Sequence, residues 1–157
     1  MRSSGVLMHL SSLPSPYGIG TMGKQAKQFV DFLEKAGQTY WQMLPICPTS
    51  YGDSPYQSPS GFAGNPYFID LDILCTKKLL KKSECKSYQW NEKDDTVDYA
   101  LLYKNRYDLL RKAKVRFFEN VPQEYGQFCE KEADWLDDFA LFMALKEAHN
   151  GAQWSEW

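Results

Sequence analysis

The sequence predicts an α/β fold that opens with a strand, a helix and a second strand and then continues as a helical module. Residues 5–10 form a nearly unbroken apolar run, which is typical of a strand buried on both faces of a parallel sheet. Residues 24–36 carry apolar residues at helical spacing, and residues 39–45 begin with one β-branched and two aromatic residues, as strands do. A strand, a helix and a strand in this order indicate a βαβ unit with parallel strands and a right-handed crossover.

The two connections of this βαβ unit differ in length and composition. Residues 11–23 join the first strand to the helix and are dense in Pro, Gly and Ser, so they form no regular element. The return to the second strand is short, and Gly37 is well placed to cap the helix at its C-terminus. In α/β folds, ligands bind where the strand-to-helix loops gather, so we expect a ligand site beside residues 11–23. The apolar stripe of the helix comprises Ala26, Phe29, Val30, Leu33 and Ala36.

Beyond residue 74 the chain is predicted to be helical. Apolar residues recur at helical spacing over residues 98–120, residues 122–132 could form a short further helix, and residues 135–148 form the last one. The last segment is hydrophobic on every side over residues 139–145 and should therefore be well buried, and Asn150 with Gly151 ends it. A single βαβ unit has bare sheet edges and faces, so the strands predict part of a larger domain.

The composition excludes several classes of function. Charged residues make up 24% of the chain and the net charge is −2, so no basic stripe offers a surface for nucleic acid. No apolar run approaches the ~20 residues of a membrane span, and the first residues lack the long apolar segment of a signal peptide. One basic cluster sits among acids, and we interpret it as a solvated helix face: Lys77, Lys78, Lys81 and Lys82.

The cysteines and histidines show no metal-binding pattern. None of the four cysteines forms a CxxC pair, and the two histidines, His9 and His149, lie far apart in sequence. A zinc site is therefore not expected. We interpret the four cysteines as thiols of a cytoplasmic protein: Cys47, Cys75, Cys85 and Cys129.

The connection over residues 47–66 is longer than the ~12–15 residues of ordinary loops, which indicates a functional loop. Asp53 is the single charged residue between Gln38 and Ile69. The loop otherwise offers hydroxyls, amides, glycines, prolines and tyrosines. Such side chains suit an uncharged polyol, because aromatic planes cover the apolar faces of sugar rings and short polar groups bond their hydroxyls. A stiff loop whose tyrosines merely pack fits the composition equally well.

Several segments of the chain, in order, closely resemble the N-terminal signature of glycoside hydrolase family 77, the 4-α-glucanotransferases. The resemblance is densest in the long loop and extends from one end of the chain to the other. It rests on residues 2–5, 12–20, 41–45, 50–58, 61–66, 69–72 and 135–145.

This resemblance implies the N-terminal portion of a (β/α)8 TIM barrel followed by a mostly helical inserted subdomain. Residues 1–72 would start the catalytic barrel with its substrate-binding loops, and residues 73–157 would belong to the subdomain inserted after strand 2. The family transfers segments of α-1,4-glucan to an acceptor sugar by a retaining double displacement. The implied partners are α-1,4-glucans and malto-oligosaccharides, with no nucleic acid, membrane, cofactor or metal.

Transfer with retention needs two carboxyl groups about 5 Å apart, and the resemblance places the family's catalytic carboxylates on later barrel strands. Asp70 and Asp72 would share a face of an extended segment and have a structural position in the family. No catalytic residue is therefore assigned, and the chain alone is expected to be inactive. His9 ends the first strand near the same face, but a lone histidine there is more often a satisfied core residue.

The resemblance assigns substrate-binding roles within the long loop. Two tyrosines are candidate stacking or hydroxyl contacts, and Ser54 is a candidate hydrogen-bond partner near the cleavage point. Asp53 would belong to the surroundings of the donor sugar and hold the loop by accepting backbone N–H bonds. The complete set of candidates is Tyr51, Asp53, Ser54, Tyr56, Gln57 and Asn65.

Two other functions remain open from the residues alone. A carbohydrate-binding protein without catalysis could use the same aromatic loop, although an incomplete barrel speaks against it. A relative that hydrolyses glucans would differ only in how well water competes with an acceptor sugar, which these residues do not determine.

Overall fold

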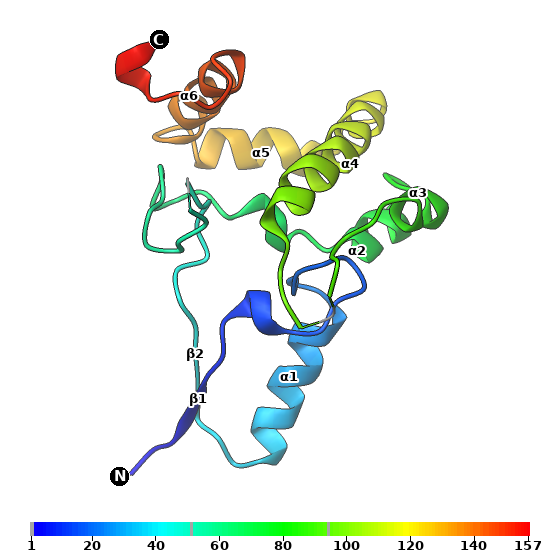
Figure 1. Cartoon of the computed structure of the whole chain (residues 1–157), viewed down its shortest axis with the longest axis vertical. Helices are drawn as coiled ribbons and strands as arrows, with labels where there is room; N and C mark the ends of the chain where they lie inside the picture. The colour runs from blue at the N-terminus through cyan, green and yellow to red at the C-terminus, as the bar shows by residue number, and fades with distance from the viewer. Residues whose placement is uncertain (1, 51, 94) are drawn as a thin grey trace.

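The computed structural model describes residues 2–50, 52–93 and 95–157 of the chain. A two-stranded sheet and one helix form one end of the molecule, and helices form the other (Figure 1). Short 3₁₀ turns occur at Leu10–Ser12, Pro66–Phe68 and Trp154–Glu156. The strands and helices are β1 Gly5–Leu7, α1 Lys24–Lys35, β2 Tyr40–Gln42, α2 Leu71–Thr76, α3 Lys82–Lys86, α4 Tyr99–Glu119, α5 Gln123–Lys131 and α6 Leu136–Ala148.

The predicted βαβ unit is confirmed. β1 and β2 pair in parallel, with Gly5 opposite Tyr40, and Met8 extends the ladder by donating to the carbonyl of Gln42 over 3.0 Å. Gly5 is required there, because a Cβ would lie 2.6 Å from the carbonyl oxygen of Tyr40.

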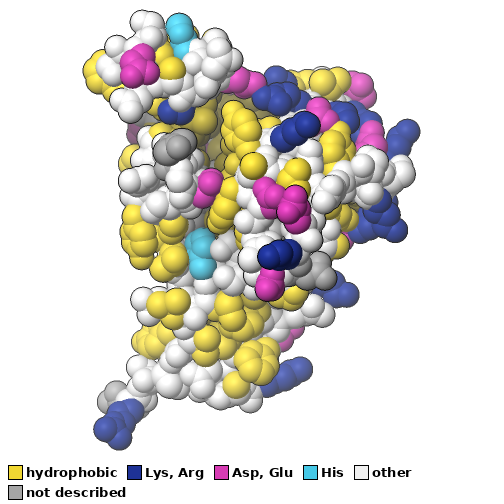
Figure 2. Space-filling model, viewed as in Figure 1, with side chains coloured by type: hydrophobic (Ala, Val, Ile, Leu, Met, Phe, Trp, Pro, Cys, Tyr) yellow, Lys and Arg dark blue, Asp and Glu magenta, His cyan; other side chains and the backbone are white. Residues whose placement is uncertain are grey.

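Both strands are shorter than predicted, and burial on both faces is not observed, since Leu7 is 59% exposed. The reason is that this sheet has only two strands among the described residues, so each strand has one neighbour. Figure 2 shows hydrophobic side chains exposed over the part of the molecule where β1, β2 and α1 lie.

α1 ends as its sequence predicts. Gly37 adopts a positive φ of 69°, its N–H donates to the carbonyl of Glu34, and the N–H of Gln38 donates to that of Leu33. This pair of bonds is a Schellman motif, which satisfies carbonyls that the helix leaves free. Of the predicted apolar stripe, Leu33 is buried, whereas Val30 remains half-exposed.

The hydrophobic core lies between the 11–23 loop and the first helices of the C-terminal part. The loop is irregular, as predicted, but it is not a surface loop, because Tyr17, Ile19 and Thr21 are almost fully buried. The indole of Trp90 packs edge to face on Tyr17, with 5.7 Å between ring centroids. The other buried apolar residues include Leu10, Leu13, Tyr67, Phe68, Leu71, Leu80, Cys85, Leu102, Leu109 and Ala113.

α4 is the longest helix and follows its predicted pattern. Asp98 caps its start by accepting a hydrogen bond from the N–H of Leu101 over 2.9 Å. Leu102, Leu109 and Ala113 are buried, as their spacing predicts. α5 occupies the predicted short segment. Among the described residues, no helix is both long and apolar enough to cross a membrane.

The prediction that residues 139–145 are well buried is wrong for this structure. No residue of α6 is buried in the described chain, and Leu141 is 60% exposed. Apolar side chains on every side of this helix favour its burial. Only one side of it has neighbours here, including Trp157, whose ring packs on Phe142. Asn150 and Gly151 end the helix as predicted, both with positive φ.

Two further predictions about residues 70–82 need correction. Asp70 and Asp72 do not share an extended segment, because Asp70 caps α2 and Asp72 lies in its first turn. The lysine cluster does not form one helix face, since Lys77 and Lys78 follow α2 whereas Lys81 and Lys82 start α3. All four lysines are exposed, as expected of solvated charges.

Candidate functional site

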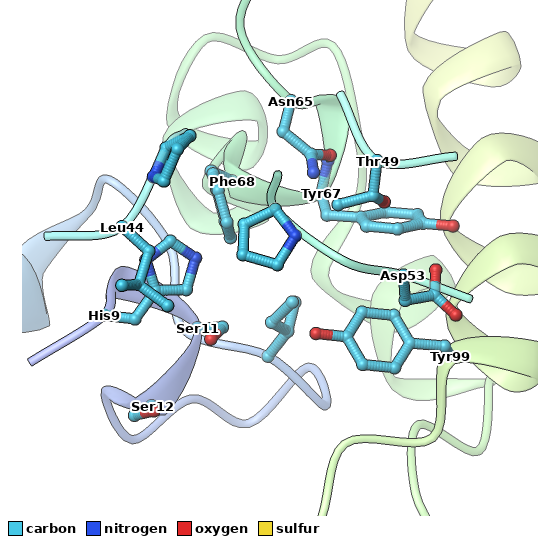
Figure 3. Close-up of a pocket in the computed structure, with 13 residues that line it drawn as sticks. His9, Ser11, Ser12, Leu44, Thr49, Asp53, Asn65, Tyr67, Phe68 and Tyr99 are labelled. Carbon is cyan, nitrogen blue, oxygen red and sulfur yellow. The ribbon is translucent and has the colours of Figure 1, made fainter. Parts of the chain in front are cut away.

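A cavity of about 220 Å³ lies where the chain leaves the C-terminal ends of β1 and β2 (Figure 3). This is the location at which the strand-to-helix loops were expected to gather. His9 and Leu44 lie on one side of it, and Asp53 and Tyr99, the latter from the start of α4, lie on the other. Apolar side chains form part of the wall, and the polar lining comprises His9, Ser11, Ser12, Thr49, Asp53, Asn65, Tyr67 and Tyr99.

Asp53 is held in an unusual backbone conformation at the edge of this cavity. Its φ is +54°, in the left-handed region that non-glycine residues rarely adopt, and its N–H donates to the carbonyl of Ser50 over 3.1 Å. Such strained residues cluster at ligand sites.

The carboxylate of Asp53 has no hydrogen-bond donor among the described residues, so the expected backbone N–H bonds to it are not observed there. Burial raises the pKa of this carboxyl above its usual range. Asp53 therefore lines the cavity with a partly buried carboxylate that can accept hydrogen bonds.

His9 contributes a second polar atom without a partner. Its Nδ1 is buried and has no hydrogen-bond partner among the described residues, while its ring packs edge to face on Phe68 at 5.5 Å. Loss of solvent lowers the pKa of the imidazole, so the ring is neutral at neutral pH. The interpretation of His9 as a satisfied core residue is therefore wrong, and its position just after the first strand was the available signal.

Tyr99 reaches the cavity from the first turn of α4, and sequence reasoning missed it. Figure 3 shows its ring beside Asp53 with the hydroxyl directed toward the cavity. Burial raises the pKa of Tyr99, and the nearby Asp53 charge adds to this shift. Tyr99 lies 46 positions after Asp53 in the sequence, so no local pattern connects the two residues.

Asn65 lines the cavity and also shapes its wall. Its side-chain oxygen accepts a hydrogen bond from the N–H of Tyr67 over 2.9 Å, which caps the 3₁₀ turn that follows. Its own N–H donates to the carbonyl of Ile46 over 2.9 Å, which ties the end of the long loop to its beginning. Asn65 is 6% exposed, so its structural bonds leave only part of the amide for a ligand.

The remaining candidates lie on a turn outside the cavity. The hydroxyl oxygen of Ser54 accepts from the N–H of Tyr56 over 3.3 Å, and Gln57 donates to the carbonyl of Ser54 over 3.1 Å. Tyr56 is 72% exposed and Gln57 is also exposed, so both side chains face outward. Tyr51 lies outside the residues that the structure describes. The structure thus joins Asp53 and Asn65 at the cavity and leaves Tyr56 on the adjacent surface.

Comparisons with known proteins agree with one another. The family model described as 4-alpha-glucanotransferase, of glycoside hydrolase family 77, matches residues 8–157. A 4-alpha-glucanotransferase from Clostridium butyricum is 52% identical over 150 residues, which cover 96% of this chain and 31% of that protein. One from Thermus thermophilus is 48% identical over 160 residues, covering 99% of this chain and 31% of the relative.

A solved structure matches the whole chain. An amylomaltase from Streptococcus agalactiae, in complex with acarbose, superposes with a TM-score of 0.95 at 42% identity and covers all of this chain and 32% of its own. The chain thus spans about a third of the length of these relatives, and the predicted N-terminal portion of a (β/α)8 barrel is confirmed. The chain belongs to the 4-alpha-glucanotransferase family, glycoside hydrolase family 77.

Proposed function

We propose that this chain supplies part of the glucan-binding cleft of an enzyme that transfers segments of α-1,4-glucan to an acceptor sugar. One observation carries the proposal: the carboxylate of Asp53 and Nδ1 of His9 line the same cavity, and neither has a partner among the described residues. Nδ1 of His9 is buried, and a buried polar atom without a hydrogen bond costs free energy, so it favours a ligand that bonds to it; Asp53 adds a partly buried carboxylate that can accept from the same ligand.

A sugar ring fits the chemistry of this cavity. Each hydroxyl both donates and accepts, so one ring can donate to Asp53 and exchange a hydrogen bond with the neutral imidazole of His9. The cavity is smaller than the ~300–1,000 Å³ of drug-sized ligand sites, which suits a single ring. On the surface beside it, Tyr56 offers an exposed aromatic plane for a neighbouring ring. The complex of the Streptococcus agalactiae amylomaltase with acarbose supports the same choice of ligand.

Catalysis is assigned to other parts of the enzyme. Retaining transfer needs two carboxyl groups about 5 Å apart, and Asp53 is the only acid among the described residues that line the cavity. We therefore propose that this chain binds the substrate and is inactive alone. In this proposal residues 1–72 belong to the catalytic barrel and residues 73–157 to a helical subdomain inserted after its second strand.

We also place the protein in the cytoplasm. The four cysteines are free in the structure, and proteins kept in a reducing compartment retain free thiols.

The test uses the native full-length protein with maltotriose as sole substrate. Transfer predicts maltotetraose and longer products together with free glucose, whereas hydrolysis predicts only maltose and glucose. Asp53→Asn should retain the backbone conformation, since Asn tolerates positive φ, and should raise the KM for maltotriose by roughly 10–100-fold if a charged hydrogen bond worth about 1.5–3 kcal/mol is weakened.

Two results would contradict the proposal. If no product is longer than maltotriose, the enzyme does not transfer glucan segments. An unchanged KM in Asp53→Asn, with the protein folded, would show that the cavity does not bind the sugar.

A further inference from the structure

Two cysteines that sequence spacing does not connect lie side by side in the core. The Sγ atoms of Cys75, near the end of α2, and Cys85, within α3, are 3.7 Å apart. Cys85 is completely buried, whereas Cys75 is partly exposed. The other two cysteines lie elsewhere: Cys47 is in the long loop, with its Sγ 3.6 Å from the carbonyl oxygen of Gly61, and Cys129 is in α5.

We propose that Cys75 and Cys85 form a redox-active dithiol that a small disulfide such as oxidised glutathione converts to an intramolecular disulfide. Closing the bond requires the sulfur atoms to approach from 3.7 Å to about 2.05 Å. Reversible disulfides of this kind are the form that occurs in reducing compartments.

The exposures of the two thiols assign their roles. Cys75 is reachable by the oxidant, so its thiolate attacks a sulfur of the small disulfide, forms a mixed disulfide and releases one thiolate. Cys85 then attacks the sulfur of Cys75, and its proton passes to the departing sulfur of the small molecule, which leaves as the second thiol. Two protein thiols are oxidised and the small disulfide is reduced to two thiols. Burial raises the pKa of Cys85 to about 12, in keeping with Cys75 as the first nucleophile.

The dithiol is connected to the loop that borders the cavity. The carbonyl of Cys85 accepts a hydrogen bond from the indole N–H of Trp90 over 3.0 Å, and Trp90 packs on Tyr17. Gly18 lies so close that a Cβ there would be 2.7 Å from the carbonyl oxygen of Trp90. A bond between Cys75 and Cys85 is therefore linked, through Trp90, to the loop that contributes Ser11 and Ser12 to the cavity.

The test treats the native protein with oxidised glutathione under non-denaturing conditions, alkylates the remaining thiols with iodoacetamide and maps the peptides by mass spectrometry. We expect one peptide pair linked through Cys75 and Cys85, with the loss of two hydrogen atoms, and both cysteines recovered as alkylated after reduction. Cys47 and Cys129 should be alkylated without reduction. The tryptophan emission of the protein, to which Trp90 contributes, should change on oxidation and return on reduction.

Variants separate the proposed site from general thiol reactivity. Cys85→Ser should stop at glutathione attached to Cys75, while the matched control Cys129→Ser should still form the link. Cys75→Ser is a second variant in case Cys85→Ser does not fold, because position 75 is the more exposed one. In Cys75→Ser, Cys85 should be alkylated only after denaturation. The proposal is overturned if folded protein shows all four cysteines unlinked after treatment, or if Cys75 is modified no faster than Cys129 and never linked to Cys85.

Discussion

The carboxylate of Asp70 accepts a hydrogen bond from the hydroxyl of Thr21, with 2.7 Å between Oδ2 and Oγ1 across 49 positions of sequence. Its other oxygen accepts from the N–H of Ile73 over 2.9 Å and so caps α2. Gly23 lies against the same side chain, since a Cβ there would be 1.7 Å from Oδ2. One buried carboxylate thus fixes the 11–23 loop to the helical part of the chain.

Asp70→Ala should lower the free energy of unfolding by at least about 2 kcal/mol. The lost helix cap contributes about 1 kcal/mol and the buried hydroxyl of Thr21, which loses its acceptor, about 1 kcal/mol; loss of the charge that stabilises the buried Arg106 adds to both. Urea denaturation of the native protein measures the change. Asp98→Ala is the matched control, because Asp98 caps α4 through the N–H of Leu101 alone and should cost only about 1 kcal/mol. Equal losses in both variants would show that the bond to Thr21 contributes nothing.

Tyr56→Ala should reduce glucan transfer while leaving stability almost unchanged. The side chain is 72% exposed, so its removal should alter the unfolding free energy by at most about 0.5 kcal/mol. Loss of an aromatic plane and a hydroxyl should lower kcat/KM for maltotriose by roughly tenfold, equivalent to about 1.4 kcal/mol.

Tyr56→Phe keeps the ring and removes only the hydroxyl, so it should retain most of the activity if stacking dominates. If Tyr56→Ala unfolds early yet its folded fraction transfers at the normal rate, the turn at residues 54–57 has a structural role and does not bind glucan.

The ends of α1 and α4 were predictable, because capping and periodicity are local, whereas the short helices α2 and α3 and the irregular residues 87–93 and 95–98 were not distinguished within the predicted helical part. Asp98 precedes a clear apolar stripe and caps α4, and Gly37 ends α1 as its position indicates. Burial was less predictable. Residues 139–145 are apolar on every side of α6, which favours burial of the helix. Their pattern does not show which surface would cover them, and α6 is exposed here.

The candidate site was predictable only where its residues are close in sequence. Asp53 and Asn65 were found because they share one unusual loop. Tyr99 arrives from a helix that begins 46 positions after Asp53, and only the fold brings them together. The same holds for Cys75 and Cys85, whose spacing matches no motif and whose sulfur atoms meet because α2 and α3 pack together.

Glu84 should make the protein sensitive to acid over a defined range of pH. It forms a bidentate ion pair with Arg116, with N–O distances of 2.6 and 2.8 Å, and also accepts a hydrogen bond from the backbone N–H of Lys81. The bond to Arg116, followed by that to Lys81, lowers the pKa of Glu84 from 4.5 to about 2. Because the folded-state pKa is the lower one, the stabilisation is complete above pH 4.5 and is lost as the pH falls toward 2.

Glu84→Gln should therefore show a flatter decline in stability between pH 4.5 and 2 than the wild type, as measured by urea denaturation at several pH values. Arg116→Met removes the partner and should flatten the same interval. If both variants decline as steeply as the wild type, other carboxyl groups determine the acid sensitivity.

Arg106 is the least satisfied charge in the described core. Its side chain is fully buried in α4, and one nitrogen, Nη2, donates to the carbonyl of Ile69. Nε and Nη1 have no hydrogen-bond partner among the described residues. Burial lowers the pKa of the guanidinium to about 10, although the charge of Asp70 opposes this effect. A shift from 12.5 to about 10 corresponds to roughly 3 kcal/mol by which the fold disfavours the charged form.

Arg106→Met should therefore leave the unfolding free energy unchanged or raise it by up to about 2 kcal/mol. The substitution removes the desolvation cost of roughly 3 kcal/mol, and it leaves the carbonyl of Ile69 without its donor, which costs about 1–3 kcal/mol. Met fills a similar volume, so little cavity forms. Arg106→Ala should be about 2–5 kcal/mol less stable than Arg106→Met, because it leaves a cavity that Met would fill. Urea denaturation at pH 7 compares the two variants. A loss in Arg106→Met as large as that in Arg106→Ala would show that the charge itself stabilises the core, through Asp70, against the cost of its burial.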